Sequence, residues 1–164
     1  MILEFSPTLI PVILAGKIGS NIASQLGTMR VTEQIDALEI MGINSAGFLT
    51  LPKIIAGIIC LPVLVIMSMF LGVASGAGIA YITGVSSMAD FQYGLQVDFI
   101  SYDVIYALIK TTIFSIVMTS VSAYHGYYTH GGALEVAKSS TKAVVYSVVI
   151  IMLSNLVLTK LLLT

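Results

Sequence analysis

Charged residues are scarce in this sequence. Among its 164 residues, Lys and Arg number 7 and Asp and Glu number 8, which is 9% of the chain against about 25% in soluble domains. Hydrophobic residues make up 57%, and the mean hydropathy is +1.02. This composition excludes an ordinary soluble domain and indicates an integral membrane protein. The net charge of −1 and the scattered basic residues give no reason to expect nucleic acid as a partner.

Motifs for catalysis are also missing. The sequence contains no HExxH, no GxSxG and no glycine-rich phosphate loop with lysine, so we expect no catalytic residue and no ATP hydrolysis by this chain. The one cysteine, Cys60, lies in an apolar run, which excludes an internal disulfide. His125 and His130 have no third ligand nearby in the sequence, so we predict no metal site and interpret both as loop or interfacial residues. Transport or a structural role is favoured over an enzyme.

Four apolar segments are long enough to cross a bilayer, which takes about 20 residues. They cover residues 5–29, 54–82, 104–124 and 143–164. The first is the weakest, because Pro7, Pro11 and Lys17 interrupt it. Glu4 stands where a signal peptide would be basic, so all four segments are expected to stay in the mature protein. We predict an all-α integral membrane protein whose residues 1–164 form a single transmembrane domain.

Basic residues indicate the orientation. Arg30 and Lys53 bound the first loop, and Lys138 and Lys142 lie in the third, whereas the loop over residues 83–103 has three aspartates and no Lys or Arg. By the positive-inside rule, the first and third loops face the cytoplasm and the second faces outward.

Residues 27–42, with the sequence GTMRVTEQIDALEIMG, form a short polar helix pattern between the first two spans. At 3.6 residues per turn, one side is apolar and comprises Val31, Ile35, Leu38 and Met41. A neighbouring stripe is acidic and comprises Glu33, Asp36 and Glu39. We predict a cytoplasmic helix over residues 31–41, with Thr32 as its N-cap, that is presented to a soluble partner. The alternative is a surface helix lying on lipid headgroups.

Two further patterns predict how helices pack. Apolar and aromatic residues recur every three or four positions, which indicates one face of an outer interfacial helix leading into the third span: Phe91, Leu95, Phe99, Tyr102 and Tyr106. This face belongs either to an aromatic belt or to an elbow at the mouth of a transport path. Small residues at four-residue spacing predict close helix packing in lipid: Gly19, Ala23, Gly27, Gly72 and Gly76.

Two lysines fall within the spans. Lys110 is expected to extend its side chain outward to water, and the alternative is a cation facing an internal cavity, where it meets a lipid phosphate. Lys17 lies near the middle of the first span. It is either a functional intramembrane charge or part of a structural pair.

The sequence AGKIGSNIASQLGTMRVTEQIDALEIMGINSAGFLTLPKIIAG, residues 15–57, closely resembles the signature region of the MlaE-type permeases. These are membrane subunits of ABC transporters that move phospholipids or other lipids across the bacterial envelope. The later sequence GGALEVAKSSTKAVVYS, residues 131–147, resembles the segment before that family's last span. The resemblance covers essentially the whole chain.

The resemblance implies a multi-pass protein of the bacterial inner membrane. It implies a homodimeric permease that binds a separate ABC-type ATPase, which holds the ATP and magnesium, and an MCE-domain lipid-binding protein on the outer side. It implies that this chain binds no cofactor itself. The residues that match the family's ATPase-coupling helix are Glu33, Gln34, Asp36, Leu38, Glu39 and Met41.

In one respect the sequence departs from the family. Family members carry an interfacial helix and a further span ahead of the region that matches Met1, so we expect an N-terminally shortened member with four spans. The rival hypothesis is a structural or assembly subunit that transports nothing.

Overall fold

The computed structural model describes residues 4–84, 88–98 and 101–163, and every regular element within those ranges is helical. The elements are α1 (Phe5–Leu14), the π-helical turn η1 (Ala15–Gly19), α2 (Ser20–Val31), α3 (Gln34–Ile40), α4 (Ser45–Thr83), α5 (Met88–Asp98), α6 (Ser101–Tyr127) and α7 (Ala133–Leu163). In the described part of the chain, four stretches are long and apolar enough to cross a membrane: Phe5–Val31, Ser45–Thr83, Tyr102–Tyr127 and Ala133–Leu161. The predicted all-α membrane architecture is confirmed.

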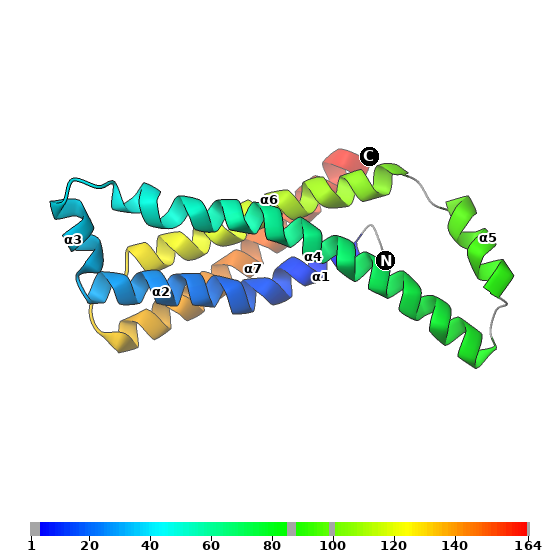
Figure 1. Ribbon diagram of the computed structural model, residues 1–164, viewed down its shortest axis with the longest axis horizontal. Coiled ribbons are helices and arrows are strands. Elements are labelled where there is room, and N and C mark those ends of the chain that lie inside the picture. The colour runs from blue at the N-terminus through cyan, green and yellow to red at the C-terminus, as the bar shows by residue number, and fades with distance from the viewer. Residues whose placement is uncertain (1–3, 85–87, 99–100, 164) are drawn as a thin grey trace.

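α6 is the central helix of the bundle. It packs against α2, α4 and α7, which run beside it along the long axis of the molecule (Figure 1). Its buried side chains include Ala107, Phe114 and Met118. α3 lies across one end of the bundle, close to the connection between α6 and α7, and α5 lies at the opposite end. The two loops predicted to be cytoplasmic are therefore at the same end.

The first span buries a small residue at every fourth position. These residues are Pro7, Pro11, Ala15, Gly19, Ala23 and Gly27. In a straight α-helix each four-residue step overshoots a full turn by about 40°, so this line would drift roughly 200° around the helix. The π-helical turn η1 accommodates an extra residue in the middle of the span and removes about 100° of that drift. The whole line can therefore stay buried against neighbouring helices.

Glycines on this line allow close contact with α6 and α7. A Cβ atom added to Gly19 would lie 2.8 Å from Ser122 Oγ in α6, and one added to Gly27 would lie 3.1 Å from Val136 Cγ1 in α7. The corresponding line on α4 has a different environment. A Cβ atom added to Gly76 would have no other atom within 4 Å, and Gly72 is only half-buried.

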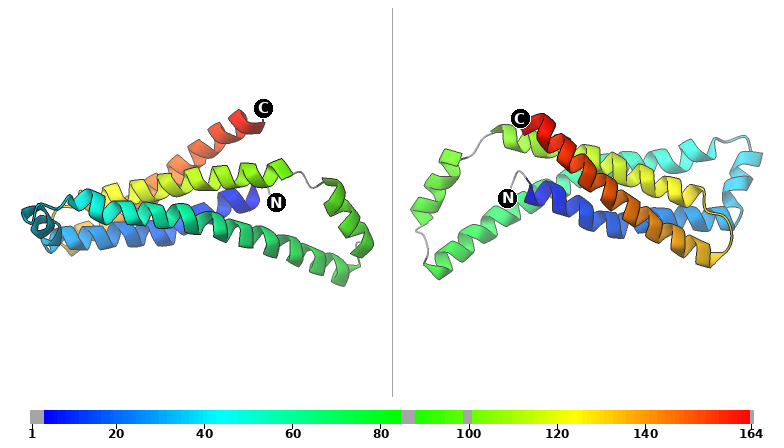
Figure 2. Two further views of the ribbon diagram at one scale, coloured as in Figure 1. Left: turned by 45° about the horizontal axis from the view of Figure 1, so that its top comes forward. Right: turned by 180° about the vertical axis from the view of Figure 1, so that it is seen from behind.

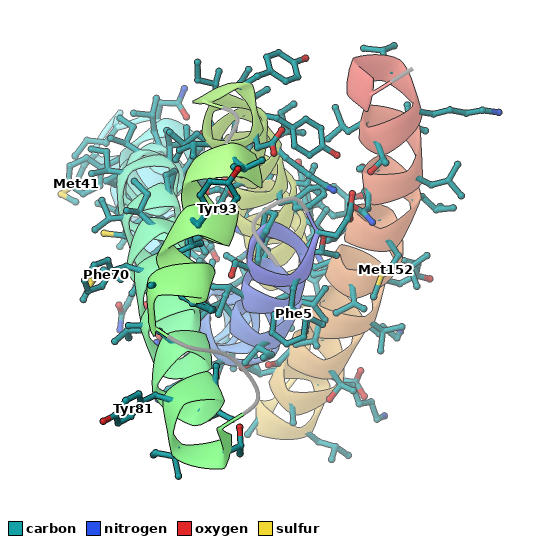
Figure 3. The ribbon with its side chains drawn as sticks, turned by 90° about the vertical axis from the view of Figure 1, so that its right-hand side faces the viewer. Phe5, Met41, Phe70, Tyr81, Tyr93 and Met152 are labelled. Carbon is teal, nitrogen blue, oxygen red and sulfur yellow. The ribbon has the colours of Figure 1, made fainter. Side chains whose placement is uncertain are left out.

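The C-terminal half of α4 leaves the bundle (Figures 1 and 2). Phe70 and Tyr81 project from it away from the other helices in Figure 3, and both are more than 70% exposed. Leu71, Ile79 and Ile82 are exposed as well. Lipid or another protein surface is the environment that suits such a helix, because water would not solvate these side chains favourably.

The predicted outer aromatic face is not one continuous surface. α5 ends at Asp98 and α6 begins at Ser101, so the pattern is divided between two helices. Phe91 is half-buried and Leu95 and Tyr102 are exposed, but Tyr106 is only 1% exposed inside the bundle. Phe99 lies outside the described residues. The prediction of a single face was therefore wrong, because α5 and α6 run in different directions (Figure 1) and Tyr106 is buried between helices.

Candidate functional site

α3 is shorter than the helix predicted over residues 31–41. Val31 belongs to α2, and the Thr32 hydroxyl donates a 2.8 Å hydrogen bond back to the Thr28 carbonyl. Thr32 therefore ends α2 and does not act as an N-cap for α3. Glu33 follows with a φ of 61°, in the left-handed region that non-glycine residues adopt at a cost of about 1–2 kcal/mol. This turn redirects the chain across the end of the bundle.

Two contacts attach the beginning of α3. Ile35 is fully buried, as expected for the apolar side of this helix. Arg30, at the end of α2, contacts Asp36 Oδ1 through a guanidinium nitrogen at 2.7 Å. The same guanidinium lies 5.8 Å from the ring centroid of Tyr127. Asp36 therefore neutralises a charge within the chain and is not a free acidic group.

Glu39 links α3 to α4 and α6. Its carboxylate oxygen Oε1 accepts hydrogen bonds from Ser45 Oγ at 2.8 Å and from the Tyr127 hydroxyl at 2.9 Å. The two hydroxyl oxygens are themselves 2.8 Å apart. The hydrogen bonds from Ser45 and then Tyr127 lower the pKa of Glu39 below its ordinary value. Glu33 and Glu39 are both exposed and Asp36 is half-buried, so the predicted acidic stripe does lie on the surface, but Asp36 and Glu39 already have partners within the chain.

The exposed side chains at the tip of α3 are mainly apolar. Ile40 is 87% exposed and Met41 is 64% exposed, and Ile43 and Phe48 add to the same end of the molecule. Met41 was expected on the buried side with Leu38, which is half-buried. It is exposed because α3 ends at Ile40 and the helical period stops there. Figure 3 shows Met41 protruding at the edge of the molecule. Gln34 is exposed at the start of the helix.

The predicted outward extension of Lys110 was wrong. Its side chain is completely buried, and its ammonium nitrogen lies 2.8 Å from Glu4 Oε1. The Tyr106 hydroxyl at 3.1 Å and Thr159 Oγ1 at 3.2 Å complete its surroundings. Since these partners come from α6, α7 and the residue before α1, Lys110 connects three parts of the bundle. Protein groups take the place of the lipid phosphate that the alternative hypothesis assumed.

Lys17 occupies a different environment. It lies in η1, it is exposed, and it forms no ion pair within the described ranges. Among the described residues, Lys17 therefore has no carboxylate partner. Across residues 4–84, 88–98 and 101–163, no group of three His, Cys, Asp or Glu side chains is arranged to hold a metal ion.

Sequence reasoning missed the residues that hold α3 in place. In the sequence, Arg30 indicates only a loop charge, and no pattern marks Ser45 or Tyr127. The Glu39–Tyr127 contact joins positions 88 residues apart, and no local pattern marks such a pair. The one local signal for such a contact was Arg30, which precedes Asp36 by six residues. The predicted N-cap, Thr32, stands between them.

The comparisons with known proteins give one consistent result. The family model described as "Permease MlaE" matches residues 1–161. A probable ABC transporter permease of Rickettsia bellii is 38% identical over 96% of this chain and 61% of its own length. A probable ABC transporter permease of Synechocystis is 36% identical over 93% of this chain and 58% of its own. The chloroplastic protein TRIGALACTOSYLDIACYLGLYCEROL 1 of Arabidopsis thaliana is 34% identical over 94% of this chain and 44% of its own. The chain thus spans about three-fifths of the length of the bacterial relatives.

Proposed function

Since the chain belongs to the MlaE family of ABC transporter permeases, we propose that it moves phospholipid or a related lipid, with a separate ATPase supplying the energy. The observation that carries this proposal is the apolar tip of α3, Ile40 and Met41, which is held on a polar network at one end of the spanning helices. An apolar tip on a rigid support suits insertion into a groove of a soluble partner.

The contacts of α3 provide a route from the partner to the membrane. Arg30 and Asp36 connect α3 to α2, and Glu39 and Tyr127 connect it to α6. A partner that changes shape on binding ATP would displace α3 and with it two spanning helices. Transport then requires that the partner bind two arrangements of the permease with different affinity.

Two observations support a lipid as the cargo. An apolar groove of about 270 Å³ lies between α2, α4 and α6, lined by side chains that include Ile22, Leu61 and Met118. At its polar edge, the Lys53 ammonium donates a 2.9 Å hydrogen bond to Gln25 Oε1. Such a groove suits an acyl chain with a polar headgroup at one end. The name of the Arabidopsis relative contains that of a galactosylated diacylglycerol.

The proposal includes the assembly around this chain. A second permease copy is the proposed neighbour of α4 around Gly72 and Gly76, whose small size permits close approach, and not of the far end of α4. An MCE-domain protein is placed on the outer side, and the whole complex in the bacterial inner membrane. ATP and magnesium are assigned to the ATPase, and the permease itself performs no chemistry.

The coupling role of α3 can be tested with two isoleucines of nearly equal exposure. Ile40 is 87% exposed at the tip of α3, and Ile82 is 84% exposed at the far end of α4. The chain is co-expressed with its ATPase, and the complex is purified from membranes. Ile40→Ser is expected to reduce co-purification of the ATPase about tenfold, since burying an isoleucine contributes about 1.5–3 kcal/mol. Ile82→Ser should retain the ATPase, and equal recovery with both variants would remove α3 from the interface.

Transport itself needs a second measurement. The purified complex is placed in vesicles that contain a fluorescent phospholipid, and the transfer of that lipid is followed with and without ATP. ATP-dependent transfer that is lost in Ile40→Ser supports the proposal. A complex that assembles and hydrolyses ATP without moving lipid would support the structural or assembly subunit instead.

A further inference from the structure

A second feature at the α3 end has no part in the proposed coupling. A pocket of about 350 Å³ lies where the last turn of α6 meets the first turns of α7. Its lining combines aromatic rings with two cations: Tyr124, His125, Tyr128, Lys138, Lys142 and Tyr146. This combination differs from the apolar groove between α2, α4 and α6, so the two cavities suit different chemical groups.

The aromatic side chains form a fixed floor. The rings of His125 and Tyr146 are stacked, with centroids 5.1 Å apart and planes 15° from parallel. Tyr124 meets His125 edge-on at 5.6 Å and also contacts Tyr128 at 4.9 Å. Aromatic rings attract one another in stacked and edge-on arrangements such as these. Contacts between the lining side chains therefore keep the aromatic side of the pocket in shape.

Hydroxyl groups beside these rings join the end of α6 to α7. Thr129 Oγ1 donates to the His125 carbonyl at 2.7 Å, and Ser139 Oγ donates to the same carbonyl. The Thr129 and Ser139 oxygens are 2.8 Å apart. These hydroxyls are used in joining α6 to α7, so the lysine ammonium groups are the strong donors that remain for a ligand.

The charge of the pocket is positive. Lys138 and Lys142 are separated by one helical turn, and Tyr146 follows one turn later on the same side of α7. Glu135 pairs with Lys138 at 2.7 Å. Within the described ranges Lys142 forms no ion pair, and the pocket has two lysines against one carboxylate. An ammonium beside tyrosine hydroxyls and an imidazole is suited to a compact anion such as phosphate.

The position of the pocket suits a headgroup. It lies where two candidate spans end, Tyr102–Tyr127 and Ala133–Leu161. Tyrosines gather at the level of lipid headgroups, and basic side chains near the cytoplasmic surface attract anionic lipids. We propose that this pocket binds the phosphate group of an anionic ligand, with Lys142 as its principal cation and the His125–Tyr146 stack as its floor. The ligand is either an anionic phospholipid of the membrane or a soluble phosphate compound.

Binding can be measured on the chain alone, without an ATPase, so its result is independent of the transport proposal. The chain is placed in lipid nanodiscs of phosphatidylcholine with a minor fraction of phosphatidylglycerol, and the retained lipids are identified by native mass spectrometry. Equilibrium dialysis with radiolabelled inorganic phosphate forms the second arm. Lys142→Gln removes the proposed cation, and Lys160→Gln removes an exposed lysine from the other end of the same helix.

Selective retention of phosphatidylglycerol that falls about tenfold in Lys142→Gln and is unchanged in Lys160→Gln would establish the lipid as ligand, since a charge-assisted hydrogen bond contributes at that level. Phosphate binding with the same dependence, without lipid selectivity, would establish a soluble ligand. Equal behaviour of both variants and the wild type in both arms overturns the proposal.

A further variant distinguishes binding in the pocket from binding to the surface charge of α7. Tyr146→Leu keeps both lysines and removes the ring that stacks on His125. Ligand retention should fall in this variant also. If it stays at the wild-type level, the surface charge of α7 binds the ligand and the pocket does not.

Discussion

Gly126 of α6 lies so close to Ala23 of α2 that a Cβ atom added to the glycine would be 2.7 Å from the Ala23 carbonyl oxygen. Backbone cannot move aside as a flexible side chain can, so Gly126→Ala should separate the two helices. We expect a loss of about 1–3 kcal/mol in the free energy of unfolding, measured by denaturant titration in detergent.

Gly94 of α5 provides the matched control for that substitution. A Cβ atom added there has no other atom within 4 Å. Gly94→Ala should leave stability unchanged or raise it by up to about 1 kcal/mol, because alanine favours the helix. Equal losses for both alanine variants would show that the contact between α2 and α6 is not the cause.

Breaking the Glu4–Lys110 pair should cost stability that a second substitution restores. Lys110 is fully buried, whereas the Glu4 side chain is 47% exposed. Glu4→Gln removes the charge that balances the buried ammonium and should cost about 1.5–3 kcal/mol of stability, less than for a fully buried pair because Glu4 is half-exposed. The double variant Glu4→Gln with Lys110→Met should recover most of that loss. Glu135→Gln, which breaks an exposed pair with Lys138, should leave the midpoint of the same titration essentially unchanged.

The Glu39 network predicts a pH-dependent release of α3. Hydrogen bonds from Ser45 and Tyr127 depress the pKa of Glu39 in the folded state. Its contribution is therefore complete above the ordinary value of 4.5 and is lost as the pH falls through the lower folded pKa. A spin label on Ala37→Cys, in a Cys60→Ser background, should become more mobile below that ordinary value.

Two substitutions identify the group responsible for that release. Glu39→Gln should make the label on α3 mobile and remove the pH dependence. Glu33→Gln changes an exposed carboxylate outside the network and should preserve the response. A transition that persists in Glu39→Gln would assign the release to another residue.

Loop charges predict which end of the bundle faces the cytoplasm. Ala37 in α3 and Ala89 in α5 are both exposed, at opposite ends of the molecule. In a Cys60→Ser background, a membrane-impermeant maleimide added to intact cells should label Ala89→Cys and leave Ala37→Cys unlabelled. Permeabilised cells should give labelling at both. The reverse pattern in intact cells would invert the topology.

The spans could be predicted because their signal is local. Length and hydropathy over about 20 residues identify a helix that suits lipid, whatever it contacts. The burial of Ile35 was likewise visible in the helical period. Helix ends were less accessible, as Met41 shows, because a period predicts a face only as far as the helix continues.

The polar contacts could not be predicted in the same way. Lys110 is paired with a carboxylate 106 residues away, and nothing near Lys110 in the sequence distinguishes burial from extension to water. The helical period predicts an acidic stripe that includes Asp36 and Glu39, yet the partner of each is a residue outside α3. Such pairs follow from the arrangement of the helices, which composition does not encode.

The π-helical turn η1 makes the number of residues in the first span a determinant of its orientation. Deleting one residue within Ala15–Gly19 would restore a regular α-helix and rotate Pro7 and Pro11 by about 100° relative to Gly27. The two halves of the span would then present their small residues in different directions. In the connection after Tyr127, a loop can adjust to the loss of one residue. In η1 the same loss would turn half of a transmembrane helix toward the wrong neighbour.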